Sequence, residues 1–269
     1  ELAAAKNINT KIDFSYPYYR EQTFCIGLGM TSKDLLLSFL AKEADPNSSG
    51  RQMPQHFSHK NLNIVSQSSP TGTQYLQALG AGFAIQRENS GGVIYVSSGE
   101  GTTSQGDFHE ALNWASREKA PVVFHIENNN YAISVPIDEQ VSGSSVYNIT
   151  SGYDSLVRYN IDGCNFFESM LAFSKAFDRS RSGKGPSLVI SNVVRLLPHS
   201  SSDDHNKYRD PKEIEDDLKR DPLKLFINEC NKKYKIDSSN FEKIKVRVDK
   251  QIEEKLSLSL DQKDPEPDS

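Results

Sequence analysis

Short apolar runs alternate with helical segments through the middle of the chain, and this alternation limits the folds that the chain can adopt. The apolar runs VIYVSS, PVVFHIE, LVRYNI and PSLVISNVV begin at residues 93, 121, 156 and 186, and helical spacing fills 104–119 and 166–181. Strands that alternate with helices form a parallel sheet that is covered on both faces. We therefore predict an α/β fold with a doubly wound, mostly parallel sheet.

The 269 residues are enough for a single large domain, and we predict one. A helical segment is expected over about residues 1–45, a helical C-terminal extension over about 211–260, and a tail or linker over 261–269. Thr31, with Asp34 three places on, predicts a capping box at the start of a helix over 31–42. Apolar residues from Phe241 to Leu256 keep helical intervals with charges between them, which predicts an amphipathic helix.

Composition excludes several classes of protein. The net charge is −5 and no basic stripe is present, so we expect no nucleic-acid partner. No apolar run is long enough to span a bilayer, and the first residues lack the layout of a signal peptide, so we expect a soluble protein. The three cysteines are far apart and odd in number, which favours a reducing compartment, and the cytoplasm is the expected location.

The predicted helix over residues 73–87 has small residues at its centre, Gly80 and Gly82 among them. Glycine lowers helix propensity, so its presence indicates that another backbone comes close, either the sheet or another subunit. Several other residues are interpreted as structural. They are His56 and His59 in a loop, His109 on a helix, His125 on a strand, and Trp114 with the phenylalanines of the 166–181 helix in the core.

Two polar tips follow neighbouring apolar runs: Gly99-Glu100-Gly101 follows the first, and Asn128 to Asn130 follow the second. Ligands of parallel sheets gather at the carboxyl ends of strands, and the 29 positions from Glu100 to Asn129 fit one strand-helix-strand unit. Carboxylate and amide oxygens suit Mg²⁺, which leaves its other positions to water and phosphate. Amides near a helix start at Gly101 favour an anion. The two tips together predict a metal-bridged diphosphate, which a glycine turn alone would not.

This pair of tips resembles the thiamine-diphosphate motif, which begins GDG and ends NN. More broadly, the chain resembles the alpha subunit of the decarboxylating component of 2-oxo acid dehydrogenase complexes, especially the branched-chain type. The resemblance implies the thiamine-diphosphate-binding fold and covers most of the chain. It rests on motifs in one order: PYYREQT at Pro17, GRQMPQHF at Gly50, SQSSPTGTQ at Ser66, GEGTTSQGD at Gly99, NNNYAISVP at Asn128 and PHSSSDDHNKYR at Pro198.

The resemblance implies roles for individual residues. Glu100 and Asn129 would bind Mg²⁺ through their side chains, and Tyr131 through its main-chain carbonyl. The contacts to thiamine diphosphate would come from Tyr19, Arg20, Ser69, Gly101 and Thr102 at the diphosphate, and from Thr71 near the aminopyrimidine ring. A potassium site that orders its loop would be formed by Ser68, Pro70, Thr73 and Gln74.

The resemblance also places His199 over the reacting thiazolium carbon. A histidine there would contact the cofactor and act in catalysis, because it can donate to a developing charge or shuttle a proton. Outside this motif it would be an ordinary loop histidine. Ser200 matches a position that is phosphorylated in some relatives, although a plain loop serine needs no such role. A phosphate at Ser200 would disturb an anion-binding site.

Three residues depart from the family pattern. Glu127 stands where branched-chain relatives have an arginine that touches diphosphate, so either Glu127 turns away or the site differs, since a carboxylate would repel phosphate. Asn130 replaces a glycine, which asparagine can mimic if its backbone is left-handed. Pro198 takes the place of one histidine of a pair.

The implied activity is the oxidative decarboxylation of a 2-oxo acid with acyl transfer to a lipoyl group; a branched-chain acid is favoured, and pyruvate is the other candidate. The implied partners are a beta subunit, which completes the site in a heterotetramer of two alpha and two beta subunits, and a lipoyl acyltransferase. Two other classes stay open. One is an acetoin dehydrogenase or a transketolase-like thiamine enzyme half; the other is a non-catalytic, partner-binding relative, for which Glu127 is the hint.

Overall fold

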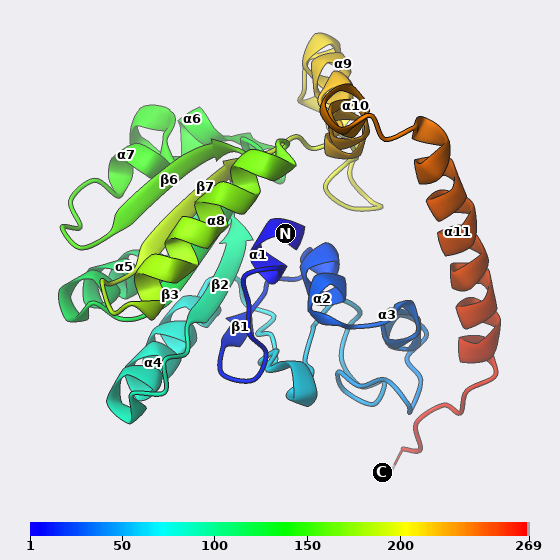
Figure 1. Cartoon of the computed structure of the whole chain (residues 1–269), viewed down its shortest axis with the longest axis horizontal. Helices are drawn as coiled ribbons and strands as arrows, with labels where there is room; N and C mark the ends of the chain where they lie inside the picture. The colour runs from blue at the N-terminus through cyan, green and yellow to red at the C-terminus, as the bar shows by residue number, and fades with distance from the viewer. Residues whose placement is uncertain (268–269) are drawn as a thin grey trace.

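The computed structural model describes residues 1–267. A five-stranded parallel sheet lies at the centre of the fold (Figure 1). The strand order is β1-β2-β3-β7-β6, and every neighbouring pair is parallel. The strands are β1 Phe14–Tyr16, β2 Ile94–Gly99, β3 Val122–Asn128, β6 Val157–Asp162 and β7 Ser187–Asn192. The predicted α/β class with a mostly parallel sheet is confirmed.

Helices pack on both faces of the sheet (Figure 1). On one face, α4 (Thr73–Glu88) and α5 (Gly106–Glu118) enclose an apolar cluster that includes Ile94 and Val96 of β2. On the other face, α1 (Leu2–Ala5), α2 (Gln22–Leu28) and α8 (Phe166–Arg181) enclose a second cluster that includes Tyr95. Successive residues of a strand point to opposite faces, so both sides of β2 are buried, and its sequence reads as one apolar run.

The N-terminal segment that was expected to be helical also contains a strand. Residues Phe14–Tyr16 pair with Ile94–Val96, and this short run gives no period by which to recognise it. The capping box at Thr31 is present, since the Thr31 hydroxyl accepts from the Asp34 amide (3.2 Å) and Asp34 accepts from the Thr31 amide (2.8 Å). It opens α3 (Ser32–Phe39).

The small residues of α4 make the close approach that the sequence predicts. A Cβ atom on Gly82 would lie 2.9 Å from Cγ2 of Val122, so one side of the helix packs tightly against β3 of the sheet. A Cβ on Gly80 would meet nothing within 4 Å in this chain. Of the two expected neighbours, the sheet is therefore the one that Gly82 contacts.

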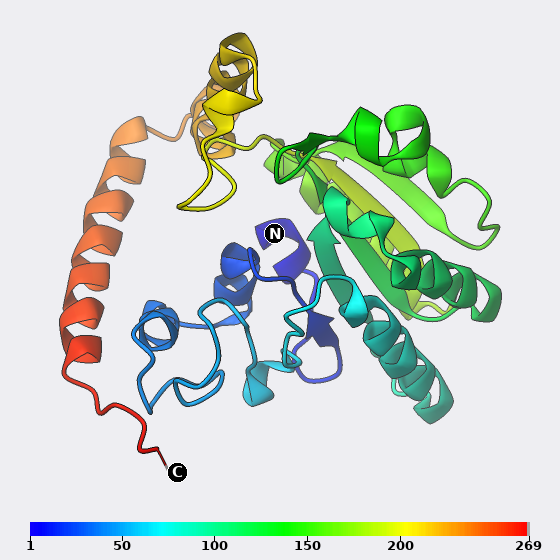
Figure 2. The same cartoon turned by 180° about the vertical axis from the view of Figure 1, so that it is seen from behind.

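The region after the sheet contains three helices. They are α9 (Pro211–Lys219), α10 (Pro222–Tyr234) and α11 (Ser238–Leu260). The predicted helical extension over about 211–260 is thus divided, first at Asp221, whose side chain caps α10 by accepting from the Leu223 amide (2.9 Å). Helix α11 stands apart from the sheet and contacts α3 and α10 (Figures 1 and 2). The last two residues of the predicted tail lie outside the described part of the chain.

Short elements complete the chain between these helices. They are the 3₁₀ turns Lys60–Leu62, Glu100–Ser104, Ser142–Ser144 and His205–Lys207, the hairpin of β4 (Tyr131–Ala132) and β5 (Val135–Pro136), and the helices α6 (Ile137–Gln140) and α7 (Val146–Ile149).

Trp114 was predicted to be in the core, which is wrong: it is 39% exposed on α5, and its indole nitrogen donates to Glu110 (2.5 Å). Within residues 1–267, no helix has the length and apolar character needed to cross a membrane.

Candidate active site

The ends of β2 and β3 bring the two polar tips together. Gly99 pairs with Glu127 in the sheet register, so the next residues of each strand leave the sheet side by side. Oε2 of Glu100 accepts a hydrogen bond from the backbone amide of Asn129 (3.3 Å). The two tips, which are separated in the sequence by one strand-helix-strand unit, therefore lie in one crevice, as the sequence predicts.

Glu100 is a buried carboxylate with one oxygen atom left over. Glu100 is 1% exposed, and its Oε1 has no hydrogen-bond partner among the residues described. Burial raises the pKa of Glu100 from 4.5 to about 7, because a charged carboxylate is poorly solvated there. A divalent cation would compensate the charge and satisfy Oε1, so the residue suits the role of a metal ligand.

The asparagine tip is held by its own side chains. Oδ1 of Asn129 accepts from the Tyr131 amide and Oδ1 of Asn128 accepts from the Asn130 amide, both at 3.0 Å. Asn130 has φ +68°, the left-handed conformation in which asparagine can replace glycine. Next in the hairpin, Ile133 also has a positive φ of +58°, which is strained for a β-branched residue. The Tyr131 carbonyl thus belongs to a tightly constrained loop.

Gly101 allows the first tip to pack against this hairpin. A Cβ atom on Gly101 would lie 2.8 Å from Cβ of Ala132 and 3.3 Å from its Cα. Gln140 adds a further contact, since its Nε2 donates to the carbonyl of Glu100 (3.2 Å). Any larger residue at position 101 would push the Tyr131 loop away from Glu100.

A cavity of about 240 Å³ opens over the two tips. Most of the predicted cofactor and metal residues line it: Tyr19, Arg20, Thr71, Glu100, Gly101, Thr102, Asn129, Tyr131 and His199. The side chains of Tyr18 and Ile133 also line it, and the sequence did not single them out. Residues from five separate parts of the chain thus surround one space.

Ser69 is the predicted cofactor ligand that does not line this cavity. Its hydroxyl is hydrogen-bonded to Nε2 of His56 (2.8 Å), so the loop role expected for His56 is observed. The potassium residues Pro70 and Gln74 have oxygens that accept hydrogen bonds from Thr73 Oγ1 and Gly72 N, both at 2.9 Å. The potassium site stays a prediction.

Arg20 and His199, which both line the cavity, contact each other. Nη2 of Arg20 lies 3.1 Å from Nδ1 of His199 and donates to the His199 carbonyl (2.9 Å). Partial burial lowers the pKa of His199, and the positive charges of Arg20 and Arg195 lower it further. Nη2 of Arg20 also lies 3.5 Å from Nε2, but the contact to Nδ1 is the shorter one, and because a guanidinium can only donate, it favours Nδ1 as the acceptor and the ring proton on Nε2. The lowered pKa favours the neutral ring, and this tautomer leaves Nε2–H free to donate.

A network in the His199 loop holds this histidine in place. Oδ2 of Asp203 accepts from the His199 amide (2.7 Å) and from the Tyr208 hydroxyl (2.6 Å). Arg195 donates to the Tyr208 hydroxyl (2.7 Å) and to the Ile133 carbonyl (2.6 Å), and its guanidinium lies over the ring of Tyr131 (5.1 Å). Sequence reasoning missed this network, because these contacts join residues that share no spacing pattern.

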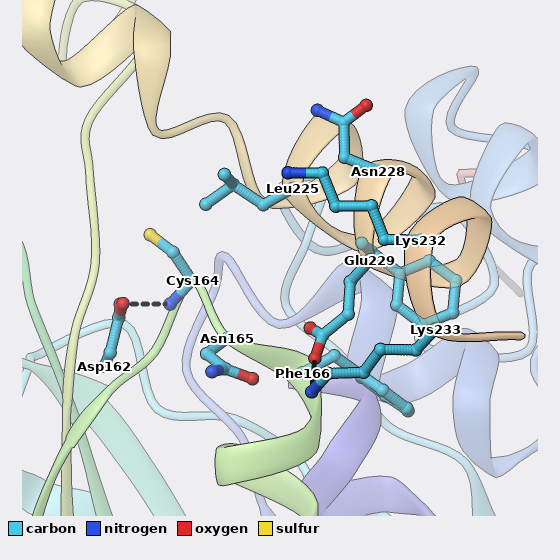
Figure 3. A pocket seen from close by; sticks show the side chains of 10 residues that line it. Asp162, Cys164, Asn165, Phe166, Leu225, Asn228, Glu229, Lys232 and Lys233 are labelled. Atoms are coloured by element: carbon cyan, nitrogen blue, oxygen red, sulfur yellow. Dashed lines mark hydrogen bonds and ion pairs between the residues drawn. The ribbon is translucent and has the colours of Figure 1, made fainter.

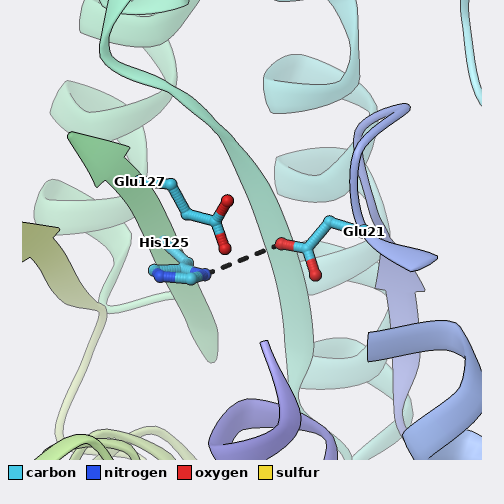
Figure 4. Close-up of side chains that lie close together, drawn as sticks. All are labelled: Glu21, His125 and Glu127. Carbon is cyan, nitrogen blue, oxygen red and sulfur yellow. Dashed lines mark ion pairs between the residues drawn. The ribbon is translucent and has the colours of Figure 1, made fainter. Parts of the chain in front are cut away.

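Glu127 turns away from the predicted diphosphate cavity. Its Oε2 accepts from the hydroxyl of Tyr18 (2.6 Å), and its carboxylate lies beside His125 and Glu21 on one face of β3 (Figure 4). The atoms of these three side chains that could serve as ligands lie within 4.8 Å of one another. Of the two alternatives that the sequence left open, the structure has the carboxylate directed away.

A larger cavity, of about 420 Å³, lies between the start of α8 and α10 (Figure 3). Asp162, Cys164 and Asn165 line one side, and Lys232 and Lys233 of α10 line the other. Its charged groups are surface side chains, and Lys233 is paired with Glu229. Size alone does not make it the functional site, because it has no buried group that lacks a partner.

Comparisons with known proteins identify the family of the chain. A family model described as the dehydrogenase E1 component matches residues 1–268. The 2-oxoisovalerate dehydrogenase subunit alpha of Bacillus subtilis (strain 168) is 43% identical over 223 residues, which are 83% of this chain and 67% of that protein.

Two further relatives are more distant. The 3-methyl-2-oxobutanoate dehydrogenase subunit alpha of Mycobacterium tuberculosis (strain CDC 1551 / Oshkosh) is 37% identical over 58% of this chain and 42% of its own length. The mitochondrial 2-oxoisovalerate dehydrogenase subunit alpha of Homo sapiens is 37% identical over 61% of this chain and 37% of its own length. The matched part therefore spans about two thirds of the Bacillus relative and less than half of the other two.

Proposed function

The chain belongs to the dehydrogenase E1 component family, and from this premise we propose that it is the alpha subunit of a 2-oxo acid dehydrogenase. Membership of the family implies dependence on thiamine diphosphate. The relatives named for 2-oxoisovalerate and 3-methyl-2-oxobutanoate favour a branched-chain 2-oxo acid as substrate. The main support from the site is the buried Glu100 oxygen without a partner, which lies beside the asparagine tip.

The residues around the cavity have separate tasks in this proposal. Glu100, Asn129 and the Tyr131 carbonyl hold Mg²⁺, and the amides of Gly101 and Thr102 receive the diphosphate near a helix start. Arg20 provides a planar cation for phosphate oxygens, and Tyr19 lies beside it. Thr71 would lie near the aminopyrimidine ring, and Ser69 would have to leave His56 to contact the cofactor.

His199 acts at the reacting end of the cavity. When bound, thiamine diphosphate accepts the electron pair that is left behind as CO₂ departs. The Nε2 proton of the neutral His199 ring can be donated to an oxygen of the substrate on which negative charge develops. Arg20 keeps this tautomer by donating to Nδ1, and the Asp203 carboxylate fixes the backbone of His199.

The lipoyl disulfide of an acyltransferase partner would then take up the acyl group as a thioester on one sulfur and the electron pair on the other, and a beta subunit would complete the site. Helix α11 is a proposed contact surface for a partner subunit. Its exposed apolar side chains include Ile244, Val248, Ile252 and Leu256, at helical intervals. An Ile252→Glu substitution should weaken assembly with the beta subunit in sedimentation velocity experiments.

The experiment that tests the proposed function is reconstitution. The full chain, with its beta subunit, is titrated with thiamine diphosphate and Mg²⁺ by calorimetry and then assayed with branched-chain 2-oxo acids, pyruvate and acetoin. Turnover of branched-chain acids supports the proposal, and a preference for acetoin would indicate the related thiamine enzymes. A reconstituted assembly that binds no cofactor would indicate a non-catalytic, partner-binding relative.

A further inference from the structure

One face of β3 contacts both ends of the segment that contains Tyr19 and Arg20. This segment, Tyr18 to Glu21, connects β1 to α2, and we call it the connecting segment. His125 and Glu127 are two positions apart on β3, so their side chains point to the same face of the sheet. Figure 4 shows both directed toward Glu21.

Glu127 holds the first residue of the connecting segment. Its Oε2 accepts from the hydroxyl of Tyr18 (2.6 Å), while the Tyr18 amide donates to the Ser97 hydroxyl (3.3 Å). Tyr18 is 7% exposed, so water cannot readily replace the carboxylate as its partner. Tyr18 lines the predicted cofactor cavity, whereas Glu127 does not. The Glu127 side chain is therefore connected to the cavity through Tyr18.

His125 holds the last residue of the same segment through Tyr95. Nδ1 of His125 lies 2.8 Å from the Tyr95 hydroxyl, which donates to Oε1 of Glu21 (3.0 Å). Since Tyr95 has one proton and gives it to Glu21, the Nδ1–H of His125 must donate to the Tyr95 oxygen. Nε2 then accepts from the Ser191 hydroxyl (3.0 Å). Burial lowers the pKa of His125 to about 3, so the ring is neutral, as this chain of hydrogen bonds requires.

The backbone alone gives this segment little support. Strand β1 ends at Tyr16 and α2 begins at Gln22, so the segment lies outside regular structure. Its internal backbone bonds are those from Glu21 N to Tyr18 O (3.1 Å) and from Gln22 N to Arg20 O (2.9 Å). The position of Arg20 therefore depends on side-chain contacts: those that hold the two ends of the segment, and its own bond to the His199 carbonyl.

We propose that Glu127 and His125 are positioning residues that fix the connecting segment, and with it Tyr19 and Arg20, for the diphosphate of the cofactor. This inference rests on the proposed function. It gives the Glu127 carboxylate a role that needs no contact with the diphosphate: Glu127 holds Tyr18, and Tyr18 begins the segment that contains Tyr19 and Arg20. A metal ion between Glu21, His125 and Glu127 is the competing interpretation, and it would require His125 to give up Tyr95.

The affinity test uses the full chain assembled with its beta subunit, four single variants and one double variant. Tyr18→Phe removes the donor, Glu127→Ala removes the acceptor, and Glu127→Gln keeps an acceptor oxygen. Tyr153→Phe is the matched control, because its hydroxyl donates to the distant His109 carbonyl (3.3 Å). The dissociation constant of thiamine diphosphate is measured by calorimetry at saturating Mg²⁺, and kcat is measured at saturating cofactor.

Loss of the Tyr18–Glu127 bond should weaken cofactor binding about tenfold in Tyr18→Phe and in Glu127→Ala, while kcat at saturating cofactor changes less than about twofold. Glu127→Gln should restore wild-type affinity to within about threefold, and Tyr153→Phe should match the wild type. The Tyr18→Phe, Glu127→Ala double variant should be no weaker than the worse single variant, because both remove the same bond.

Hydrogen exchange separates failure of this inference from failure of the proposed function. Without cofactor, the amides of Tyr18, Glu21 and Gln22 should exchange faster in Glu127→Ala and Tyr95→Phe than in the wild type. If the wild type binds no cofactor, the proposed function fails, and exchange still tests the positioning contacts. Unchanged exchange and affinity in these variants would overturn the inference. So would a stoichiometric metal ion in the wild type that is lost in Glu127→Gln.

Discussion

The two halves of the candidate site are held in different ways. Glu100 and Asn129 lie directly at strand ends, where the register of β2 and β3 fixes their backbone. Arg20 and His199 lie on irregular segments and are placed by contacts between side chains and loops. Glu100 is 1% exposed, whereas His199 is only partly buried. The strand-tip half is therefore formed before any ligand arrives, and the loop half depends on a few polar contacts.

This difference predicts how substitutions should act. In the strand-tip half, a change should weaken metal and cofactor binding strongly while the sheet still folds, because the sheet is stabilised by its two apolar clusters. In the loop half, a change should have smaller effects and should alter mobility or pH dependence. The four predictions below test this division.

Glu100→Gln should have the largest effect. It removes the buried carboxylate, so affinity for Mg²⁺ and Mg²⁺-dependent affinity for thiamine diphosphate should fall at least about 100-fold, measured by calorimetry on the assembly. The folded-state pKa of Glu100 is raised from 4.5 to about 7, so the protonated form is favoured in the fold, and its contribution to stability is lost as pH rises through about 7.

The same variant should therefore lose binding without losing stability. At pH 8 and without metal, the melting temperature of Glu100→Gln should equal or exceed that of the wild type, because no charge is buried. Glu242→Gln, on the exposed side of α11, is the control for removing a carboxylate. A Glu100→Gln protein that melts well below the wild type would contradict the idea that this half is built for a cation at the expense of stability.

Gly101→Ala should have the next largest effect. The new Cβ would lie 2.8 Å from Cβ of Ala132, so the Tyr131 loop must move, which should weaken cofactor binding about tenfold and destabilise the chain by about 1–3 kcal/mol. Gly106→Ala is the matched control, since its Cβ would meet nothing within 4 Å at the start of α5. Urea unfolding should show Gly106→Ala at or slightly above wild-type stability. Equal behaviour of the two variants would contradict the close contact.

The same division explains which features the sequence could predict. Alternating strands and helices, the capping box at Thr31 and the two polar tips depend on local spacing, and all of them are present in the structure. Strand β1 was missed because three residues give too short a pattern, and they become a strand only by pairing with β2.

Contacts between segments that are far apart in the chain could not be predicted from the sequence. The direction of Glu127 depends on Tyr18, which is 109 positions away, and the placement of His199 depends on Arg20, which is 179 positions away. The wrong prediction for Trp114 has a similar cause, because helical spacing does not reveal which part of a helix side remains uncovered in one chain. Sequence motifs indicated that Arg20 and His199 belong to one site, but not how each is held.

Asp203→Asn should affect the loop half more mildly. Asp203 accepts from the His199 amide and the Tyr208 hydroxyl, so its loss should free the His199 loop and lower kcat/KM between about threefold and tenfold. Limited proteolysis should cut the 197–209 loop faster, with Mg²⁺ affinity unchanged. Asp204 caps the neighbouring 3₁₀ turn, so Asp204→Asn is the control within the same loop. A large loss of Mg²⁺ affinity in Asp203→Asn would show that the two halves are not independent.

The smallest expected effect is a shift in pH dependence. Burial and the positive charges of Arg20 and Arg195 lower the pKa of His199 below its ordinary 6.5, so the ring should stay neutral to a more acidic pH than a free histidine. NMR titration should place its midpoint below 6.5 in the wild type, with the resonance assigned by its absence in His199→Asn. In Arg20→Met, one of the charges that disfavour protonation is gone, so the midpoint should move to higher pH. The Glu100 half should not respond to this substitution, because the strand register and not Arg20 holds it. A His199 midpoint that does not move would mean that Arg20 and His199 are apart in solution, and the loop half would then need a ligand to assemble it.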